Sequence, residues 1–257
     1  MPSQKRHDGR LPGQLRPVTL TLDFVPTADG SCLIQMGGTR VICTASFQPG
    51  VPEWMKGRGA GWLTAEYGML PASTGKRKGR PIGKPDSRAT EIQRLIGRAI
   101  RPAMAMDRLG ENTICLDCDV LTADGGTRTA AITGAYVALA QAVAKAAGRG
   151  QLPRGVLRGP VAAVSVGLVG GRAVLDLDYH EDVSAEVDMN VAMIGRRYVE
   201  VQGTSEHRPF DDRQLAEMLR LARRGIGQLM ARQRKIIAAI ERAAQSAASA
   251  PPTQRGS

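Results

Sequence analysis

Apolar and polar residues alternate along the N-terminal part of the chain, which is the period-two pattern of half-buried β-strands. Three such segments follow one another, at residues 18–25, 31–36 and 40–47. Asp29-Gly30 and Gly37-Gly38 separate them, and because these dipeptides favour tight turns, the pattern predicts a strand meander. A further candidate strand occupies residues 61–70 within an otherwise irregular stretch.

The pattern changes to a helical spacing at Arg88. Apolar side chains then recur every three or four residues, at Ile92, Leu95, Ile96, Ala99 and Ile100. This spacing predicts an amphipathic helix that ends or bends at Pro102. An alternating strand follows at 112–121, and then an alanine-rich helix at 129–148 with Gly148 as its expected C-cap.

The C-terminal half again places strands before a helix. The predicted elements are two strands joined at Gly170-Gly171, a strand at 184–194, a strand at 197–202 and a helix at 212–243. Asp211 is the expected N-cap of this helix, with Gln214 three residues later. Because both halves run strands into later helices, we expect an α/β fold in which two related layers share one core.

A chain of 257 residues suffices for one large α/β domain or two small ones. We expect a single domain over residues 1–243, which includes a polar N-terminal arm at 1–17 and a basic loop at 72–87. The low-complexity tail at 244–257 is expected to be disordered.

Composition excludes several classes of protein. Aromatic residues make up only 4% of the chain, which argues against stacking of nucleobases on many rings. Cys115 and Cys118 form a C-x-x-C without a second cysteine pair, so a zinc or redox role is not favoured. The N-terminus lacks the apolar run of a signal peptide, and glycines and an arginine break the apolar stretch at 161–177. We therefore expect a reducing, cytoplasmic location and no membrane segment.

Charge is distributed unevenly along the chain, whose formal net charge is +11. Residues 76–108 hold ten Lys and Arg against three Asp and Glu, whereas residues 176–188 hold six acids and no Lys or Arg. A basic surface around a local acidic cluster favours a polyanionic partner beside a catalytic or metal-binding site. A merely basic surface remains the alternative on composition alone.

The segment Asp124-Gly125-Gly126-Thr127-Arg128-Thr129 stands where a strand ends and a helix begins. Free N–H groups at a helix N-terminus bind anions, and Arg128 adds a guanidinium suited to a phosphate. An ordinary strand-to-helix turn is the alternative reading of such a short motif. The segment is not a Walker loop, because no lysine follows the glycines at the required spacing.

The acidic cluster lies on a predicted alternating strand. Ser184, Glu186, Asp188 and Asn190 share one face of that strand, and Asp182 precedes them with the same parity. Gathered carboxylates suit Mg²⁺ or Mn²⁺ rather than zinc. A solvated strand face is the alternative, but like charges on one face are costly unless a cation or a proton relieves them.

Arg88 stands near the start of its predicted helix, where the helix dipole disfavours a cation. A bound anion would remove this conflict. Pairing with an acid, or free solvation, is the more ordinary explanation for a single arginine.

Several long motifs, in order, resemble the bacterial ribonuclease PH family. They are the opening RHDGR…QLRP, GWLTAEYGMLP (61–71), SRATEIQRLIGRAIR (87–101), TICLDCDVLTADGGTRTAAITGA (113–135), HEDVSAEVDMN (180–190) and YVEVQGT (198–204). The resemblance covers the chain from about Arg6 to Arg242, and motifs of this length are highly specific.

The resemblance implies a ribosomal-protein-S5-domain-2-like α/β fold assembled as a homo-hexameric ring of three dimers. It also implies a phosphate-dependent 3′-to-5′ exoribonuclease, or tRNA nucleotidyltransferase, that trims precursor tRNA. Such an enzyme transfers the terminal nucleotide reversibly to inorganic phosphate, its co-substrate, and releases a nucleoside diphosphate.

The family's functional residues map onto positions of this sequence as follows. The phosphate ligands fall on Arg88, Gly126, Thr127 and Arg128, and the catalytic, metal-binding aspartates fall on Asp182 and Asp188. Lys76, Arg77, Lys78 and Arg80 stand in the loop expected to bind RNA. Ala72 replaces the arginine that usually follows Met-Leu-Pro in the family. The sequence of the loop after it also differs from the usual family sequence.

Two other functions are compatible with parts of this pattern. A non-catalytic RNA-binding ring subunit would keep the basic loop without needing both aspartates and the phosphate ligands. A transferase acting on a free nucleotide would use the glycine-rich turn but would not produce diphosphates from RNA and phosphate alone.

Overall fold

The computed structural model describes residues 6–80 and 86–249, and its fold is built on two β-sheets. The first sheet has the order β1-β2-β3-β5-β4. Its strands are β1 (Val18–Leu22), β2 (Gly30–Met36), β3 (Thr39–Pro49), β4 (Trp62–Met69) and β5 (Asn112–Thr122). The first three form the predicted antiparallel meander, and β4 is the parallel neighbour of β5.

The second sheet is antiparallel throughout and has the order β7-β6-β8-β9. Its strands are β6 (Val161–Val169), β7 (Arg172–Leu175), β8 (Val187–Ile194) and β9 (Arg197–Ser205). As predicted, β6 and β7 are joined at Gly170-Gly171, where both glycines have positive φ angles of 58° and 72°. The mixed α/β fold expected from the sequence is therefore confirmed.

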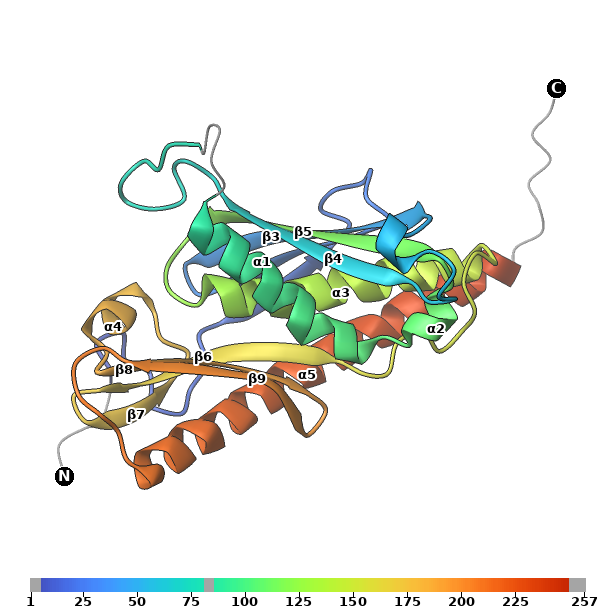
Figure 1. The fold of residues 1–257 in the computed structure, drawn as a ribbon. Helices are drawn as coiled ribbons and strands as arrows, with labels where there is room; N and C mark the ends of the chain where they lie inside the picture. Colours follow the sequence, from blue (N-terminus) through green and yellow to red (C-terminus); the bar gives the residue numbers. More distant parts are fainter. Residues whose placement is uncertain (1–5, 81–85, 250–257) are drawn as a thin grey trace.

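Three long helices pack against these sheets, and two short helices and two 3₁₀ turns complete the fold (Figure 1). The helices are α1 (Ser87–Ile100), α2 (Met106–Leu109), α3 (Thr127–Gly148), α4 (Tyr179–Ser184) and α5 (Asp212–Ser249), with 3₁₀ turns at Glu53–Met55 and Arg101–Ala103. α1 connects the parallel strands β4 and β5, a connection that requires a crossover. α3 contacts strands of both sheets, and α5 packs on α3, β6 and β7.

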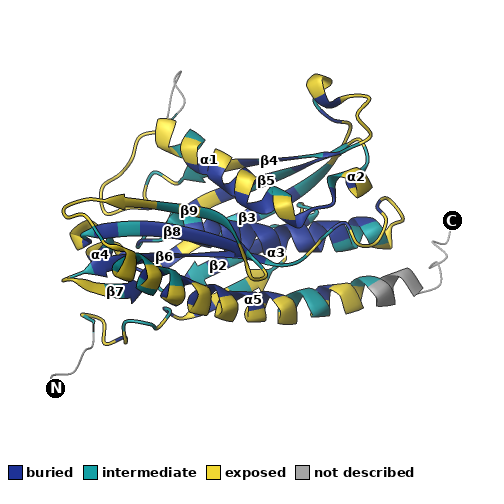
Figure 2. Cartoon of the chain, turned by 60° about the horizontal axis from the view of Figure 1, so that its bottom comes forward, coloured by how far each residue is buried: buried dark blue, intermediate teal, exposed yellow. Residues whose placement is uncertain are grey.

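One continuous hydrophobic core joins both sheets around α3 (Figure 2). By length and composition alone, α3 is long and apolar enough to cross a membrane. However, 83% of its most apolar 18-residue segment is buried inside the fold. Small residues let α3 pack closely against the first sheet. At Gly134, for example, a Cβ would lie only 2.7 Å from Ile34 Cγ2 and 2.8 Å from Cys43 Sγ. The apolar character of α3 is therefore explained by the core.

Strand β5 shows the alternation expected from the sequence. Leu116, Cys118 and Val120 are buried on one face, while Cys115 lies on the other face and is partly exposed. Because the two cysteines of the C-x-x-C point to opposite faces of the strand, they are not arranged as a pair of ligands. Both are free thiols.

The predicted strand at 184–194 is wrong at its beginning. Residues 179–184 form the short helix α4, and the strand begins only at Val187. The cause is a capping box: the Asp178 carboxylate accepts from the Glu181 N–H, and the Glu181 carboxylate accepts from the Asp178 N–H. Strand-like parity therefore does not apply to Asp182 or Ser184.

Helix ends also differ slightly from the predictions. α3 has Arg149 rather than Gly148 as its C-cap, and the left-handed glycine is Gly150 with φ 72°. α5 begins with the predicted Asp211–Gln214 capping pair but continues to Ser249, beyond the expected end at 243. Parts of the predicted arm (1–5), basic loop (81–85) and tail (250–257) lie outside the described residues.

Candidate active site

A cavity of about 580 Å³ opens where the starts of α1 and α3 meet α4 and the second sheet. These segments lie at the same end of the molecule (Figure 1). Eight of the ten predicted site residues line the cavity: Lys76, Lys78, Arg88, Gly126, Thr127, Arg128, Asp182 and Asp188. Arg80 lies in an adjoining cavity of about 320 Å³, and Arg77 is exposed on the loop between them.

The glycine-rich turn before α3 requires its glycines. Gly125 and Gly126 have φ angles of 69° and 64°, and a Cβ at Gly125 would lie 2.5 Å from the Leu177 carbonyl oxygen. Gly126 is the N-cap of α3 and makes no side-chain capping hydrogen bond. The first N–H groups of α3 therefore have no capping side chain as a competitor for an anion.

Two buried residues of the N-terminal part hold this turn from behind. Arg16 donates to the carbonyl oxygens of Asp124 and Gly125, and its guanidinium pairs with Asp176 at 2.7 Å. The Thr39 hydroxyl donates to the Gly125 carbonyl oxygen at 2.6 Å and accepts from the Asp124 N–H at 2.9 Å. The side chains that hold the turn, those of Arg16, Thr39 and Asp176, do not line the cavity.

Arg88 reaches the cavity from α1, but the start of α1 differs from the expectation. Asp86, the N-cap, accepts from the N–H groups of Arg88 and Ala89 at 3.1 and 3.4 Å. This carboxylate, which also pairs with Lys78, supplies the negative charge that the helix dipole favours. The position of Arg88 is therefore no evidence for a bound anion by itself. Among the described residues no acid pairs with its exposed side chain, which lines the cavity.

Arg128 is oriented by β9 and α1. Its Nη1 lies 3.4 Å from Gln202 Oε1 and 3.6 Å from Glu91 Oε1, while Gln202 Nε2 donates to Glu91 Oε1 at 3.1 Å. The side chain is only 17% exposed. This support holds the guanidinium at the cavity wall with a limited choice of rotamers.

Asp182 and Asp188 come together from α4 and β8 rather than from one strand. Burial, together with the neighbouring charge of Asp182, raises the pKa of Asp188 to about 6, against the opposing effect of Arg128. Burial also raises the pKa of Asp182, against the opposing effect of Arg88 and Arg128. Asp188 Oδ1 is buried and has no hydrogen-bond partner among the described residues. A bound proton or cation would therefore stabilise this pair of aspartates.

The remaining acids of the predicted cluster serve other purposes. Asp176, Asp178 and Glu181 pair with Arg6, Arg10 and Arg16 of the N-terminal arm, whose side chains are less than a tenth exposed. Glu186 accepts from the Gly171 N–H at 2.9 Å. Of the residues predicted to share one strand face, Asp188 and Asn190 line the cavity from β8 and Asp182 lines it from α4, whereas Ser184 and Glu186 do not line it.

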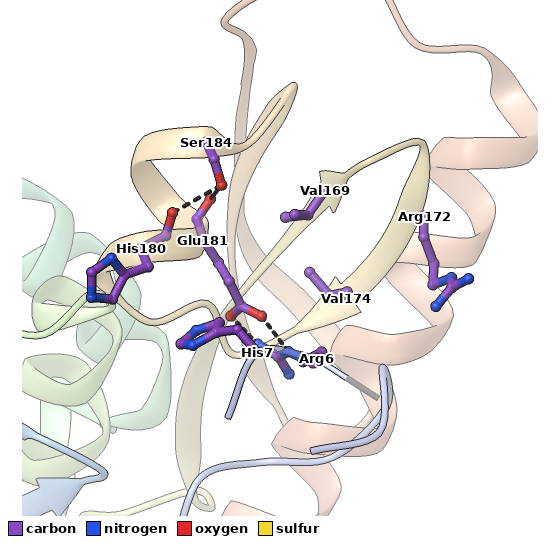
Figure 3. A pocket seen from close by; sticks show the side chains of 8 residues that line it. All are labelled: Arg6, His7, Val169, Arg172, Val174, His180, Glu181 and Ser184. Carbon is purple, nitrogen blue, oxygen red and sulfur yellow. Dashed lines mark hydrogen bonds and ion pairs between the residues drawn. The ribbon is translucent and has the colours of Figure 1, made fainter. Parts of the chain in front are cut away.

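A second cavity, of about 540 Å³, lies on the other side of α4 (Figure 3). Arg6 reaches from the arm to the Glu181 carboxylate there, and His7 lies beside it. His7, Asp178 and Glu181 have ligand atoms within 4.8 Å of one another. Because His7 Nε2 already lies 2.7 Å from Asp178 Oδ2, and Arg6 and Arg10 bind Glu181, these contacts anchor the arm.

Several residues of the site were not predicted from the sequence. Tyr67 and Ser165 contribute polar groups at or beside the cavity, and Arg16 and Thr39 support the turn. Ser165 gave one usable signal, since it interrupts the apolar run of β6 and lies opposite Asn190 in the sheet register. The other residues follow ordinary strand or loop patterns, so no local signal marked them.

The raised pKa of Asp188 predicts how the free energy of unfolding of the metal-free protein depends on pH. Because its folded pKa lies near 6, above the ordinary 3.8, the folded state binds the extra proton between about pH 4 and 6. The free energy of unfolding should fall as pH rises through this window, and Asp188→Asn should raise it above pH 6 by up to about 3 kcal/mol. Denaturant unfolding in a chelator at pH 4 and 8 measures this; an equal effect at both values would contradict it.

Two family models match the chain. Domain 1 of the 3′ exoribonuclease family matches residues 14–145, and domain 2 of the same family matches residues 159–225. The chain belongs to the 3′ exoribonuclease family. The broader family implied by the sequence motifs is thus confirmed, and the bacterial ribonuclease PH branch within it stays a prediction. The two matched regions share the cavity, since the glycine-rich turn and both arginines come from domain 1 and both aspartates from domain 2.

Solved structures show the same fold as this member of the family. A chain of the Archaeoglobus fulgidus exosome with RNA bound to the active site has a TM-score of 0.76 and 22% identity, over 88% of this chain and 91% of that chain. Rice (Oryza sativa) Rrp46 has a TM-score of 0.71 and 18% identity, over 91% and 98% of the two chains. A chain of an archaeal exosome core has a TM-score of 0.70 and 21% identity, over 90% and 92%. At these identities the likeness establishes the fold.

Proposed function

We propose that this protein is a phosphate-dependent 3′-to-5′ exoribonuclease that trims the 3′ end of precursor tRNA. It transfers terminal nucleotides to inorganic phosphate and releases nucleoside diphosphates in a reversible reaction. The observation that carries the proposal is the convergence, in one cavity, of the N-terminus of α3 with two arginines and two aspartates. The resemblance of the sequence to bacterial ribonuclease PH supports this choice within the family.

The reaction brings two anions together, and the chain's own residues can position them. A phosphate oxygen forms a bond to the phosphorus of the terminal phosphodiester, and the bond from that phosphorus to the 3′ oxygen of the preceding nucleotide breaks. Arg88, Arg128 and the N–H groups at the start of α3 hold the attacking phosphate and offset its charge. The released 3′ oxygen takes up a proton, which the attacking hydrogen phosphate or solvent supplies.

Asp182 and Asp188 are suited to hold Mg²⁺ or Mn²⁺. Carboxylate oxygens are the ligands that these hard cations prefer, and Asp188 Oδ1 is a buried acceptor without a partner among the described residues. When bound, such an ion stabilises the charge that develops during phosphoryl transfer. Its removal by a chelator should abolish turnover.

RNA is the polymer that best fits the entrance to the cavity. Lys76 and Lys78 line it, and Arg77 and Arg80 extend the basic surface along the same loop. The name of the Archaeoglobus fulgidus structure places RNA at the active site of that relative. We further propose a homo-hexameric ring of three dimers in the cytoplasm, in keeping with the resemblance to bacterial ribonuclease PH.

The second candidate function is that of a subunit of an exosome-type ring, which the solved relatives suggest. A non-catalytic subunit has no need of paired aspartates facing paired arginines, and this chain has both. The purified protein alone should therefore degrade RNA.

One experiment tests the proposed function directly. The protein is incubated with a 3′-extended tRNA, with and without inorganic phosphate, and the released nucleotides are identified. Phosphate-dependent release of nucleoside diphosphates is expected. Monophosphates released without phosphate would contradict phosphorolysis, and activity that requires a second chain would favour the exosome-type subunit.

Neutralising the basic loop should weaken RNA binding and flatten its dependence on salt. The variant changes Lys76, Arg77, Lys78 and Arg80 to glutamine. Each lost phosphate contact should reduce the slope of log affinity against log salt by about 0.7 for single-stranded RNA.

The matched control changes four exposed basic residues of α5, namely Arg213, Arg234, Lys235 and Arg242. Binding of a short RNA is measured at several salt concentrations for both variants. The slope should change only in the loop variant; an unchanged slope there would mean that the loop points away from the substrate.

A further inference from the structure

We propose that Tyr67 is a positioning residue that directs the Thr127 hydroxyl toward the phosphate. The inference rests on the proposed phosphate site. Tyr67 acts on that site through Thr127 and is not itself one of the proposed phosphate ligands. Tyr67 Oη donates a hydrogen bond to Thr127 Oγ1 at 2.9 Å. Thr127 lines the cavity as the first residue of α3, whereas Tyr67 is only 6% exposed.

The register of the first sheet brings these two residues together. Tyr67 lies on β4 opposite Cys118 of β5, and β5 continues directly into the glycine-rich turn that starts α3. Tyr67 shares the buried face of β4 with Leu63 and Ala65, so its ring packs in the core while its hydroxyl reaches the first residue of α3. The rigid sheet therefore sets the position of the Tyr67 oxygen.

The direction of this hydrogen bond matters because a threonine hydroxyl has a single hydrogen. When Thr127 Oγ1 accepts from Tyr67, its own hydrogen remains for another acceptor. The ionised oxygens of inorganic phosphate are acceptors only, so phosphate needs that hydrogen. If Thr127 instead donated its hydrogen to Tyr67, only the lone pairs of Thr127 Oγ1 would face the phosphate.

Tyr67 is suited to remain the donor. Burial raises the pKa of its phenol, so the hydroxyl keeps its proton at neutral pH even though Arg88 and Arg128 act in the opposite sense. A phenol is also a stronger hydrogen-bond donor than an aliphatic hydroxyl. These properties favour the chain of donors Tyr67 to Thr127 to phosphate.

The test is a double-mutant cycle that uses inorganic phosphate as the ligand. Tyr67→Phe removes one oxygen and should raise the phosphate concentration for half-maximal rate about three- to tenfold. The RNA concentration for half-maximal rate should not change. In a Thr127→Val background, Tyr67→Phe should have no further effect on phosphate, because the hydroxyl through which it acts is absent. A Thr127→Ser background should restore the effect.

Tyr136→Phe is the matched control, since Tyr136 is a buried tyrosine of α3 that does not line the cavity. It should leave both half-maximal concentrations unchanged. An unchanged phosphate requirement in Tyr67→Phe would overturn the inference, and so would an equal loss in the Thr127→Val background. A loss confined to RNA would overturn it as well.

Calorimetric binding of inorganic phosphate to the metal-loaded protein separates this inference from the proposed function. Weaker phosphate binding by Tyr67→Phe supports the inference even if the protein releases no diphosphates. Wild-type turnover with normal phosphate binding by Tyr67→Phe overturns the inference and leaves the proposed function standing. Absence of phosphate binding to the wild-type protein overturns both.

Discussion

Replacing Asp188 with asparagine is expected to slow phosphate-dependent degradation of RNA by about a hundredfold to a thousandfold, a loss typical of groups that stabilise charge in the transition state. Asparagine preserves the shape of the side chain but removes its charge. It therefore removes the anionic oxygen ligand that is suited to a divalent cation. Turnover is measured at saturating RNA, phosphate and Mg²⁺.

Glu186→Gln is the matched control for this prediction. Glu186 belongs to the same acidic stretch, but its carboxylate accepts from the Gly171 N–H and does not line the cavity. The control should retain a near-native rate, and RNA affinity and ring assembly should be native in both variants. A near-native rate of Asp188→Asn at saturating metal would show that the chemistry lies elsewhere.

Removal of either cavity arginine is expected to raise the phosphate requirement far more than the RNA requirement. Arg88→Ala and Arg128→Ala each remove a charge-assisted hydrogen bond worth about 1.5–3 kcal/mol, which corresponds to about one to two decades in phosphate affinity. The reverse reaction should suffer in parallel, since the same groups must hold the terminal phosphate of the nucleoside diphosphate.

The two arginines come from the starts of two different helices and should act on one ligand. Their effects should therefore be non-additive in a double-mutant cycle, measured as the phosphate dependence of degradation of a short RNA. Arg94→Ala is the control, because Arg94 is exposed on α1 and does not line the cavity. Strictly additive losses confined to RNA affinity would show that Arg88 and Arg128 bind the RNA backbone.

The sequence predicted most elements of the fold because their signals are local. Alternation located β2 and β5 to within a residue or two at either end, and Gly170-Gly171 marked the β6–β7 turn. Helical spacing located α1, whose buried face is formed by the predicted apolar residues. The two glycines before α3 marked the turn that starts this helix, because positive φ angles and close backbone contact require that residue type.

Local patterns misled where a charged residue had a distant partner. The sequence shows six acids within residues 176–188, but it does not show that three of them, Asp176, Asp178 and Glu181, pair with arm arginines about 160 to 175 positions away in the chain. The Asp178–Glu181 capping box also turned part of the predicted strand into α4. In the same way, Asp86 supplies the charge that the start of α1 needed.

By itself, the sequence determined the order of strands and helices, the glycine-rich turn and the residue types of the site, since periodicity, turn chemistry and motifs are properties of neighbouring residues. Only the tertiary structure decided which acids face the cavity, that Arg16 and Thr39 hold the turn, and that Tyr67 reaches Thr127. Hydrogen bonds and burial depend on atoms brought together across the sheets. The raised pKa of Asp188 follows from that burial, which no window of sequence contains.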